Sequence, residues 1–99
     1  MLKYDKQTDG GKTVIFLEGE LDTLSSQTLE KDLDQLLDGA ADLTVDLEKL
    51  DYITSAGLRI LMQMETAMEQ KGSMKIIHAS EEIMEIFDVT GFSDILTIV

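Results

Sequence analysis

The chain of 99 residues has no cysteine, no proline, no tryptophan and a single histidine. Without cysteine it can form neither a disulfide framework nor a thiolate metal site nor a cysteine nucleophile. No stretch approaches the roughly 20 apolar residues that span a bilayer, and the first residues, MLKYDKQTDGG, lack the apolar core of a secretion signal. We therefore expect a cytoplasmic protein with no metal, no cofactor and no membrane partner.

Basic residues are also scarce, because eight lysines and arginines face twenty aspartates and glutamates, for a net charge of −12. This charge would repel the phosphates of nucleic acid and the anionic surface of a membrane. It favours protein partners and argues against direct nucleic-acid binding, although an excess of acid also simply keeps a small domain soluble. At this length, with 43% hydrophobic residues, we expect residues 1–99 to form one domain.

Alternating apolar and polar residues predict strands. Residues 1–7 and 12–21 flank the turn signal Asp9-Gly10-Gly11 and predict an N-terminal hairpin. Residues 42–50 alternate in the same way, and residues 73–79 and 94–99 are short apolar runs that we interpret as two further strands.

Three segments between these strands have helical spacing of their apolar residues. Residues 25–39 begin with serines and carry leucines on one face, a second helix runs from residue 55 to Lys71-Gly72, and a third follows Ser80 and ends at Thr90-Gly91. Strands joined by helical crossovers pair in parallel. The sequence therefore predicts an α/β fold in which about three helices pack against a mixed, mostly parallel sheet that starts with a hairpin.

Two features that suggest catalysis do not withstand inspection. Residues 10–13, GGKT, resemble the end of a phosphate-binding loop, but that loop requires glycine where Lys6 stands and a helix where a strand begins. His78 has no second histidine or cysteine with which to form a metal site or a catalytic pair. We predict that the protein is not an enzyme and has no catalytic residues.

The segment DYITSAGLRIL, residues 51–61, places four small residues where a strand leads into a helix. Serine is a favoured N-cap, so we expect Ser55 to cap this helix, with Ala56 and Gly57 in its first turn. Small neighbours would leave the hydroxyl open to the active site of another protein, and the free N–H groups of the first turn could accommodate a phosphate. The alternative is that Ser55 only caps the helix.

Four segments resemble the STAS family, and especially the bacterial anti-sigma factor antagonists. LDYITSAGLRIL, residues 50–61, is similar to the family's serine-containing signature, and LEGELD, residues 17–22, resembles its early G-E-L-D segment. LTVDLEKLDYI and IFDVTGFSDIL, residues 43–53 and 86–96, match further family segments in the same order. The resemblance covers nearly the whole chain and implies a single STAS domain.

The resemblance also implies a site. Ser55 matches the family's phosphoacceptor, and Asp22 and Asp46 match acidic positions that lie near that serine, unless they serve only as turn residues. Many members carry aspartate where this chain has Thr54, which makes Thr54 a second candidate for the phosphate. The expected partner-binding residues are Asp22, Asp46, Thr54, Ser55, Ala56 and Gly57.

The implied function is a partner switch that controls transcription through a sigma factor. The unphosphorylated protein would bind an anti-sigma factor that is also a serine kinase, and phosphorylation of Ser55 would end the binding. A serine phosphatase of the PP2C type would reset the switch. The alternative within the same fold is an unphosphorylated STAS subunit of a transporter or a signalling complex.

Overall fold

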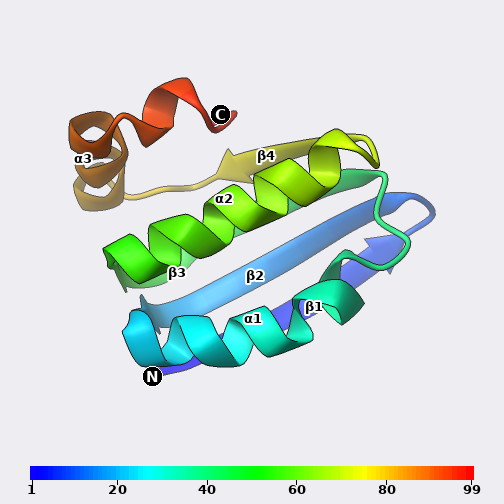
Figure 1. The fold of residues 1–99 in the computed structure, drawn as a ribbon, viewed down its shortest axis with the longest axis horizontal. Helices are drawn as coiled ribbons and strands as arrows, with labels where there is room; N and C mark the ends of the chain where they lie inside the picture. The colour runs from blue at the N-terminus through cyan, green and yellow to red at the C-terminus, as the bar shows by residue number, and fades with distance from the viewer.

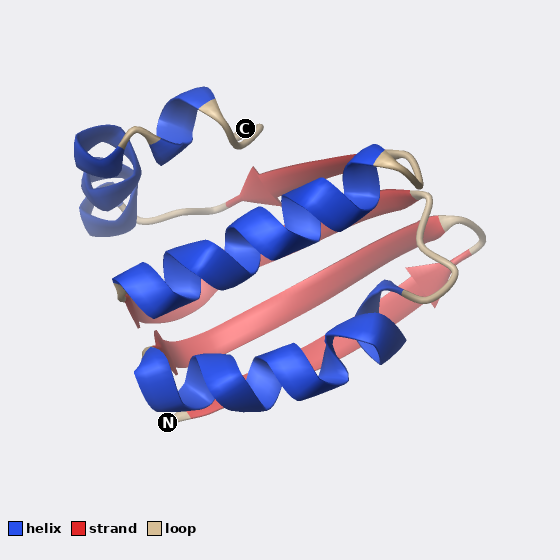
Figure 2. Ribbon diagram, viewed as in Figure 1, coloured by secondary structure: helices blue, strands red, loops and turns tan.

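The computed structural model describes residues 1–99 as a four-stranded sheet with two helices on one face and a third helix beyond one edge (Figures 1 and 2). The strands lie in the order β1-β2-β3-β4, with β1 antiparallel to β2 and the other pairs parallel. This confirms the predicted α/β class and the mixed sheet. The elements are β1 (Leu2–Asp9), β2 (Lys12–Leu21), α1 (Thr23–Leu37), β3 (Asp42–Ile53), α2 (Ser55–Glu69), β4 (Ser73–Ile77), α3 (Glu81–Thr90) and the 3-10 turn η1 (Phe92–Asp94).

The predicted hairpin is present, with Asp9 paired to Lys12 at its tip. Gly10 has a φ of +64°, a left-handed conformation that glycine adopts without a steric penalty. The strand β1 is also tied to α1, because the Tyr4 hydroxyl donates a hydrogen bond to Asp32 and the Lys6 ammonium donates to the carbonyl of Gln35 at 2.9 Å. These contacts fix α1 over the β1–β2 half of the sheet.

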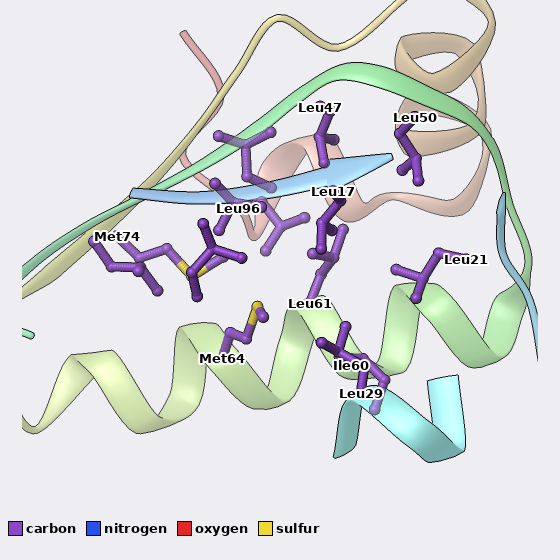
Figure 3. Close-up of a cluster of buried hydrophobic side chains, with 14 of the residues drawn as sticks. Leu17, Leu21, Leu29, Leu47, Leu50, Ile60, Leu61, Met64, Met74 and Leu96 are labelled. Carbon is purple, nitrogen blue, oxygen red and sulfur yellow. The ribbon is translucent and has the colours of Figure 1, made fainter. Parts of the chain in front are cut away.

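The core lies between the sheet and the two helices on its face. Alternate residues of β2 and β3, such as Leu17 and Leu47, point toward α2, from which Leu61 and Met64 point back (Figure 3). Twenty-three buried apolar residues form this single cluster. The opposite face of the sheet carries no helix (Figure 2). None of the helices is long and apolar enough to cross a membrane.

The predicted ends of the helices are partly confirmed. Ser80 caps α3 by accepting a hydrogen bond from the N–H of Ile83 at 3.2 Å, and Gly91 ends that helix with a φ of +82°. The first helix begins two residues earlier than predicted, because Asp22 is its N-cap and the expected serines lie inside the first turn.

The prediction of a strand at residues 94–99 was wrong. Residues 92–94 form η1, and the segment then makes one parallel bridge, between Ile98 and Ile76 of β4. Two backbone hydrogen bonds form it, from Ile76 to Thr97 at 2.8 Å and from Val99 to Ile76 at 2.9 Å. The segment still buries Leu96, so its apolar residues contribute to the core without forming a ladder.

Candidate functional site

The C-terminal ends of β2 and β3 lie side by side at one end of the sheet, because the two strands are parallel. Leu21 pairs with Ile53, and the next residue, Thr54, donates its backbone N–H to the carbonyl of Leu21 at 3.0 Å. From this Leu21–Thr54 junction the chain enters α1 on one side and α2 on the other, so both helices start at the same end of the molecule (Figure 1).

Ser55 is the first residue of α2 and is exposed, and its hydroxyl makes no hydrogen bond within the protein. The prediction that it caps the helix was wrong by one residue, because the N-cap is Thr54, whose carbonyl accepts the first helical bond from Leu58 at 2.9 Å. The backbone N–H groups of the first turn of a helix have no partner inside the helix. Ser55 therefore presents a free hydroxyl at the positive end of α2.

Thr54 is less accessible than Ser55. It is half-buried, and its hydroxyl points back to the carbonyl of Leu21, with 3.4 Å between the two oxygens. It makes no capping hydrogen bond to the first turn of α2. Of the two hydroxyl groups proposed from the sequence, the structure leaves only that of Ser55 without a partner.

The small residues after Ser55 also serve the packing of the fold. Gly57 is buried, and a Cβ built on it would lie 2.6 Å from the carbonyl oxygen of Leu21 and 2.7 Å from Cγ1 of Ile53. Glycine here lets α2 pack directly against the strand ends, and it cannot present a side chain to a partner. Ala56 is half-buried beside it.

Asp22 lies at the junction as predicted, one residue beyond Leu21. Its carboxylate accepts a hydrogen bond from the backbone N–H of Ser25 at 2.9 Å, and the Ser25 hydroxyl accepts one from the backbone N–H of Asp22 at 2.9 Å. These two bonds form a capping box. The hydrogen bonds from Ser25 hold the pKa of Asp22 below its usual value. Asp22 therefore has a structural role as the N-cap of α1, where the sequence analysis proposed a turn residue or a partner contact.

Asp46 does not lie near Ser55, contrary to the expectation from the family. It pairs with Phe16 and Ile77 in the middle of the sheet, and the extended chain from Asp46 to Ile53 spans roughly 20 Å. Its Oδ1 accepts a hydrogen bond from the N–H of Glu48 at 2.9 Å and lies 3.1 Å from Nδ1 of His78.

His78, for which the sequence analysis predicted no role, is thus the contact of Asp46. It has a φ of +60°, which is unusual for a residue with a side chain, at the point where the chain leaves β4. The contact between Asp46 and His78 could be predicted only once the register of β3 and β4 was known, because His78 follows Ile77, the ladder partner of Asp46.

No group of three or more histidine, aspartate or glutamate side chains gathers closely enough to hold a metal ion. A hollow of about 390 Å³ lies on the helix-free side of the sheet, near Phe16, Glu18 and Asp46. It does not include Ser55, and it is a shallow surface feature bordered by charges of both signs.

Two exposed apolar residues near the junction were missed from the sequence. Leu24, in the first turn of α1, is 75% exposed, and Tyr52, near the end of β3, is 54% exposed. Leu24 lies off the buried stripe of α1, which begins at Ser26 and Leu29, so its position on the helix was a signal that the sequence already carried. The exposure of Tyr52 depends on the irregular pairing near the end of β3, which no local pattern reveals.

The fold, with two helices starting beside a free serine at the strand ends, defines a STAS domain. The family model described as "Mlab, STAS domain" matches residues 4–98, and the chain therefore belongs to this family. The resemblance inferred from the sequence is confirmed.

Individual relatives are similar over most of the chain. The anti-sigma-B factor antagonist of Bacillus subtilis (strain 168) is 34% identical over 98 residues, which cover 98% of this chain and 90% of that protein. An anti-sigma factor antagonist from Mycobacterium paratuberculosis has a similar structure, with a TM-score of 0.88, 18% identity, and coverage of 99% of this chain and 85% of that one. The Bacillus cell fate determinant SpoIIAA in its phosphorylated form gives a TM-score of 0.74 at 16% identity, covering 98% and 91%. At such identities the structural matches show the fold.

Proposed function

We propose that this protein is an anti-sigma factor antagonist whose binding is switched off by phosphorylation of Ser55. The observation that carries the proposal is the exposed Ser55 hydroxyl, which has no partner within the protein and stands at the start of α2. The relative named as an anti-sigma-B factor antagonist, which aligns over nearly the whole chain, supports the binding role. In this role the protein is the substrate of the enzymes that phosphorylate and dephosphorylate Ser55, and it is not an enzyme itself.

Binding would be controlled by charge. A phosphoserine adds about −1.5 to −2 charges at neutral pH, here at the junction where Leu21, which precedes Asp22, is bonded to Thr54, and on a domain that already carries −12. Repulsion and the cost of removing water from the phosphate would oppose docking. A tenfold loss of affinity requires only about 1.4 kcal/mol, which one phosphate inside a contact surface can supply.

The fold should survive this modification. The phosphate would lie at the positive end of α2, where free N–H groups and the helix dipole favour an anion. Ser55 is also outside the core, so the added group displaces no packed side chain. We therefore expect the phosphorylated protein to differ from the unmodified one in its surface and not in its architecture.

The partners follow from the same scheme. An anti-sigma factor that is also a serine kinase would transfer the phosphate from ATP to Ser55, and a PP2C-type phosphatase would remove it. Thr54 would be a poor acceptor, because its hydroxyl is half-buried and directed at the carbonyl of Leu21.

The test is to measure the affinity of the anti-sigma factor for the unmodified protein, the Ser55-phosphorylated protein and Ser55→Ala by titration calorimetry. We expect the unmodified protein and the alanine variant to bind alike and the phosphorylated protein to bind at least tenfold more weakly. Equal binding of the phosphorylated protein would contradict the switch. If the folded, unmodified protein bound no anti-sigma factor, the role of an assembly subunit would be favoured instead.

A further inference from the structure

The Leu21–Thr54 junction is bordered by two large apolar side chains that the core does not use. Leu24 is 75% exposed and Tyr52 is 54% exposed, and neither belongs to the buried cluster. Single apolar residues scattered over a surface are normal. These two are not scattered, because both belong to the same end of the sheet as Ser55.

Hydrogen bonds and ladder pairs connect both residues to the end of β2. Tyr52 is the ladder neighbour of Glu20 on β2. The carbonyl of Glu20 accepts a hydrogen bond from the Ser25 hydroxyl at 2.8 Å, which fixes the first turn of α1 and with it Leu24. One residue further along, Leu21 binds the backbone of Thr54, which precedes Ser55.

Leu24 and Tyr52 lie on opposite sides of the sheet. Ile53 is buried toward the helices, so Tyr52, its neighbour in an alternating strand, points to the helix-free side. Leu24 belongs to α1, on the helix side (Figure 2). A partner that contacts both must therefore sit across the end of the sheet, where the Leu21–Thr54 junction lies and α2 begins at Ser55.

The side chains next to these two residues carry acidic groups, and one of them, Glu20, is paired with the N-terminal ammonium of Met1 at 2.6 Å. Glu20, the neighbour of Tyr52, and Asp51, which precedes it, are exposed, and Asp22 lies two residues before Leu24. A surface that fits this end of the molecule needs apolar pockets edged by lysine or arginine. Aromatic and large apolar side chains in such pockets supply most of the binding energy of many interfaces, while charges at the rim mainly speed association.

We propose that Leu24 and Tyr52 are the two apolar anchors by which this protein holds the anti-sigma factor, in a contact that caps the sheet end and is rimmed by basic residues of that partner. This inference rests on the proposed function and adds the binding geometry to it. It also accounts for the switch, because a phosphate on Ser55 enters the contact at this end of the sheet.

The test compares Leu24→Ala and Tyr52→Ala with Val89→Ala, a matched control in which a 79% exposed apolar residue of α3 is truncated. The affinity of each unphosphorylated variant for the anti-sigma factor is measured by calorimetry, after circular dichroism has established that its unfolding temperature matches that of the wild type. We expect each anchor variant to bind at least about tenfold more weakly and the control to change less than twofold. Asp51→Asn should slow association and reduce its dependence on salt.

The outcomes separate this inference from the proposed function. If the wild type binds and both anchor variants bind equally well, the anchors are refuted while the proposed function stands. An effect of Val89→Ala as large as that of the anchor variants would also refute them, because the contact would then not be confined to the sheet end. If the folded wild type binds no anti-sigma factor, the proposed function fails and the anchors fail with it.

Discussion

The substitution Gly57→Ala tests whether the packing of α2 against the strand ends requires glycine. The added Cβ would lie 2.6 Å from the Leu21 carbonyl oxygen, 2.7 Å from Cγ1 of Ile53 and 2.8 Å from Cγ of Leu21. Two of these contacts are with side chains of the core, and the shortest is with backbone that cannot rotate away. The first turn of α2 must therefore move outward.

The expected loss follows from two opposing effects. Overpacking a core site costs about 1–3 kcal/mol, while alanine is favoured over glycine inside a helix by up to about 1 kcal/mol. The net loss should be about 1–2 kcal/mol, which for a domain of this size lowers Tm by roughly 4–15 °C.

The assay is urea and thermal denaturation followed by circular dichroism. Gly11→Ala is the control, because a Cβ there would meet only the Cβ of Ala41 at an ordinary contact distance of 3.4 Å. The control should be near neutral. Stability of Gly57→Ala equal to or above that of the wild type would refute the explanation of the small residues after Ser55. A variant that is destabilised but folded should also be phosphorylated more slowly, because Ser55 moves with the helix.

Three further predictions concern stability. Hydrogen bonds from Ser25 lower the pKa of Asp22, so the stabilisation by its carboxylate is present above the unfolded-state pKa near 4 and is lost as pH falls through the lower folded-state pKa. Asp22→Ala should therefore lower Tm at pH 7, and its difference in Tm from the wild type should vanish in strong acid. A difference in Tm that does not depend on pH would contradict the capping role. Burial, and secondly Glu69, raise the pKa of Glu65, whose Oε2 has no hydrogen-bond partner. The ionised carboxylate of Glu65 therefore lowers the stability of the fold above the raised pKa, and this cost vanishes below the unfolded-state pKa near 4.3. Glu65→Gln should raise Tm at pH 7 and leave Tm unchanged at pH 3. A lower Tm of the variant at pH 7 would show that the carboxylate has a partner. Leu61 is fully buried, so Leu61→Ala should cost about 2–5 kcal/mol in urea denaturation, against almost nothing for Val89→Ala.

Periodicity predicted the architecture because most strands have one buried face and the helices have one apolar stripe. Leu43, Val45 and Leu47 alternate along β3, and all three are buried in the core that α2 covers. The apolar stripe of α1 is the face that covers β1 and β2. The C-terminal segment was mistaken because a short run such as Ile95, Leu96 and Ile98 is apolar in a strand and in a turn alike. The difference between a strand and a turn here lies in the tertiary structure, because β4 pairs with this C-terminal segment at one residue only.

The site was predicted in part. Thr54 and Ser55 are both good N-caps, and the choice between them depended on the backbone bond from Thr54 to Leu21, which no local pattern reveals. Gly57 was interpreted only as keeping the Ser55 hydroxyl accessible, and its close packing against the ends of β2 and β3 was not predicted. Asp46 was placed near Ser55 by resemblance, and the length of β3 separates them. Phosphorylation, and partner contact at Asp22, Asp46, Thr54, Ser55, Ala56 and Gly57, stay predictions.

The most direct test of the account is the intact mass of the protein before and after incubation with ATP and the serine-kinase anti-sigma factor of the same organism. Wild type, Ser55→Ala and Thr54→Ala are compared. The account predicts one added phosphoryl group on the wild type and on Thr54→Ala, and none on Ser55→Ala. A phosphoryl group that persists on Ser55→Ala and disappears from Thr54→Ala would contradict the assignment of Ser55, and no modification of the folded wild type would contradict the switch itself.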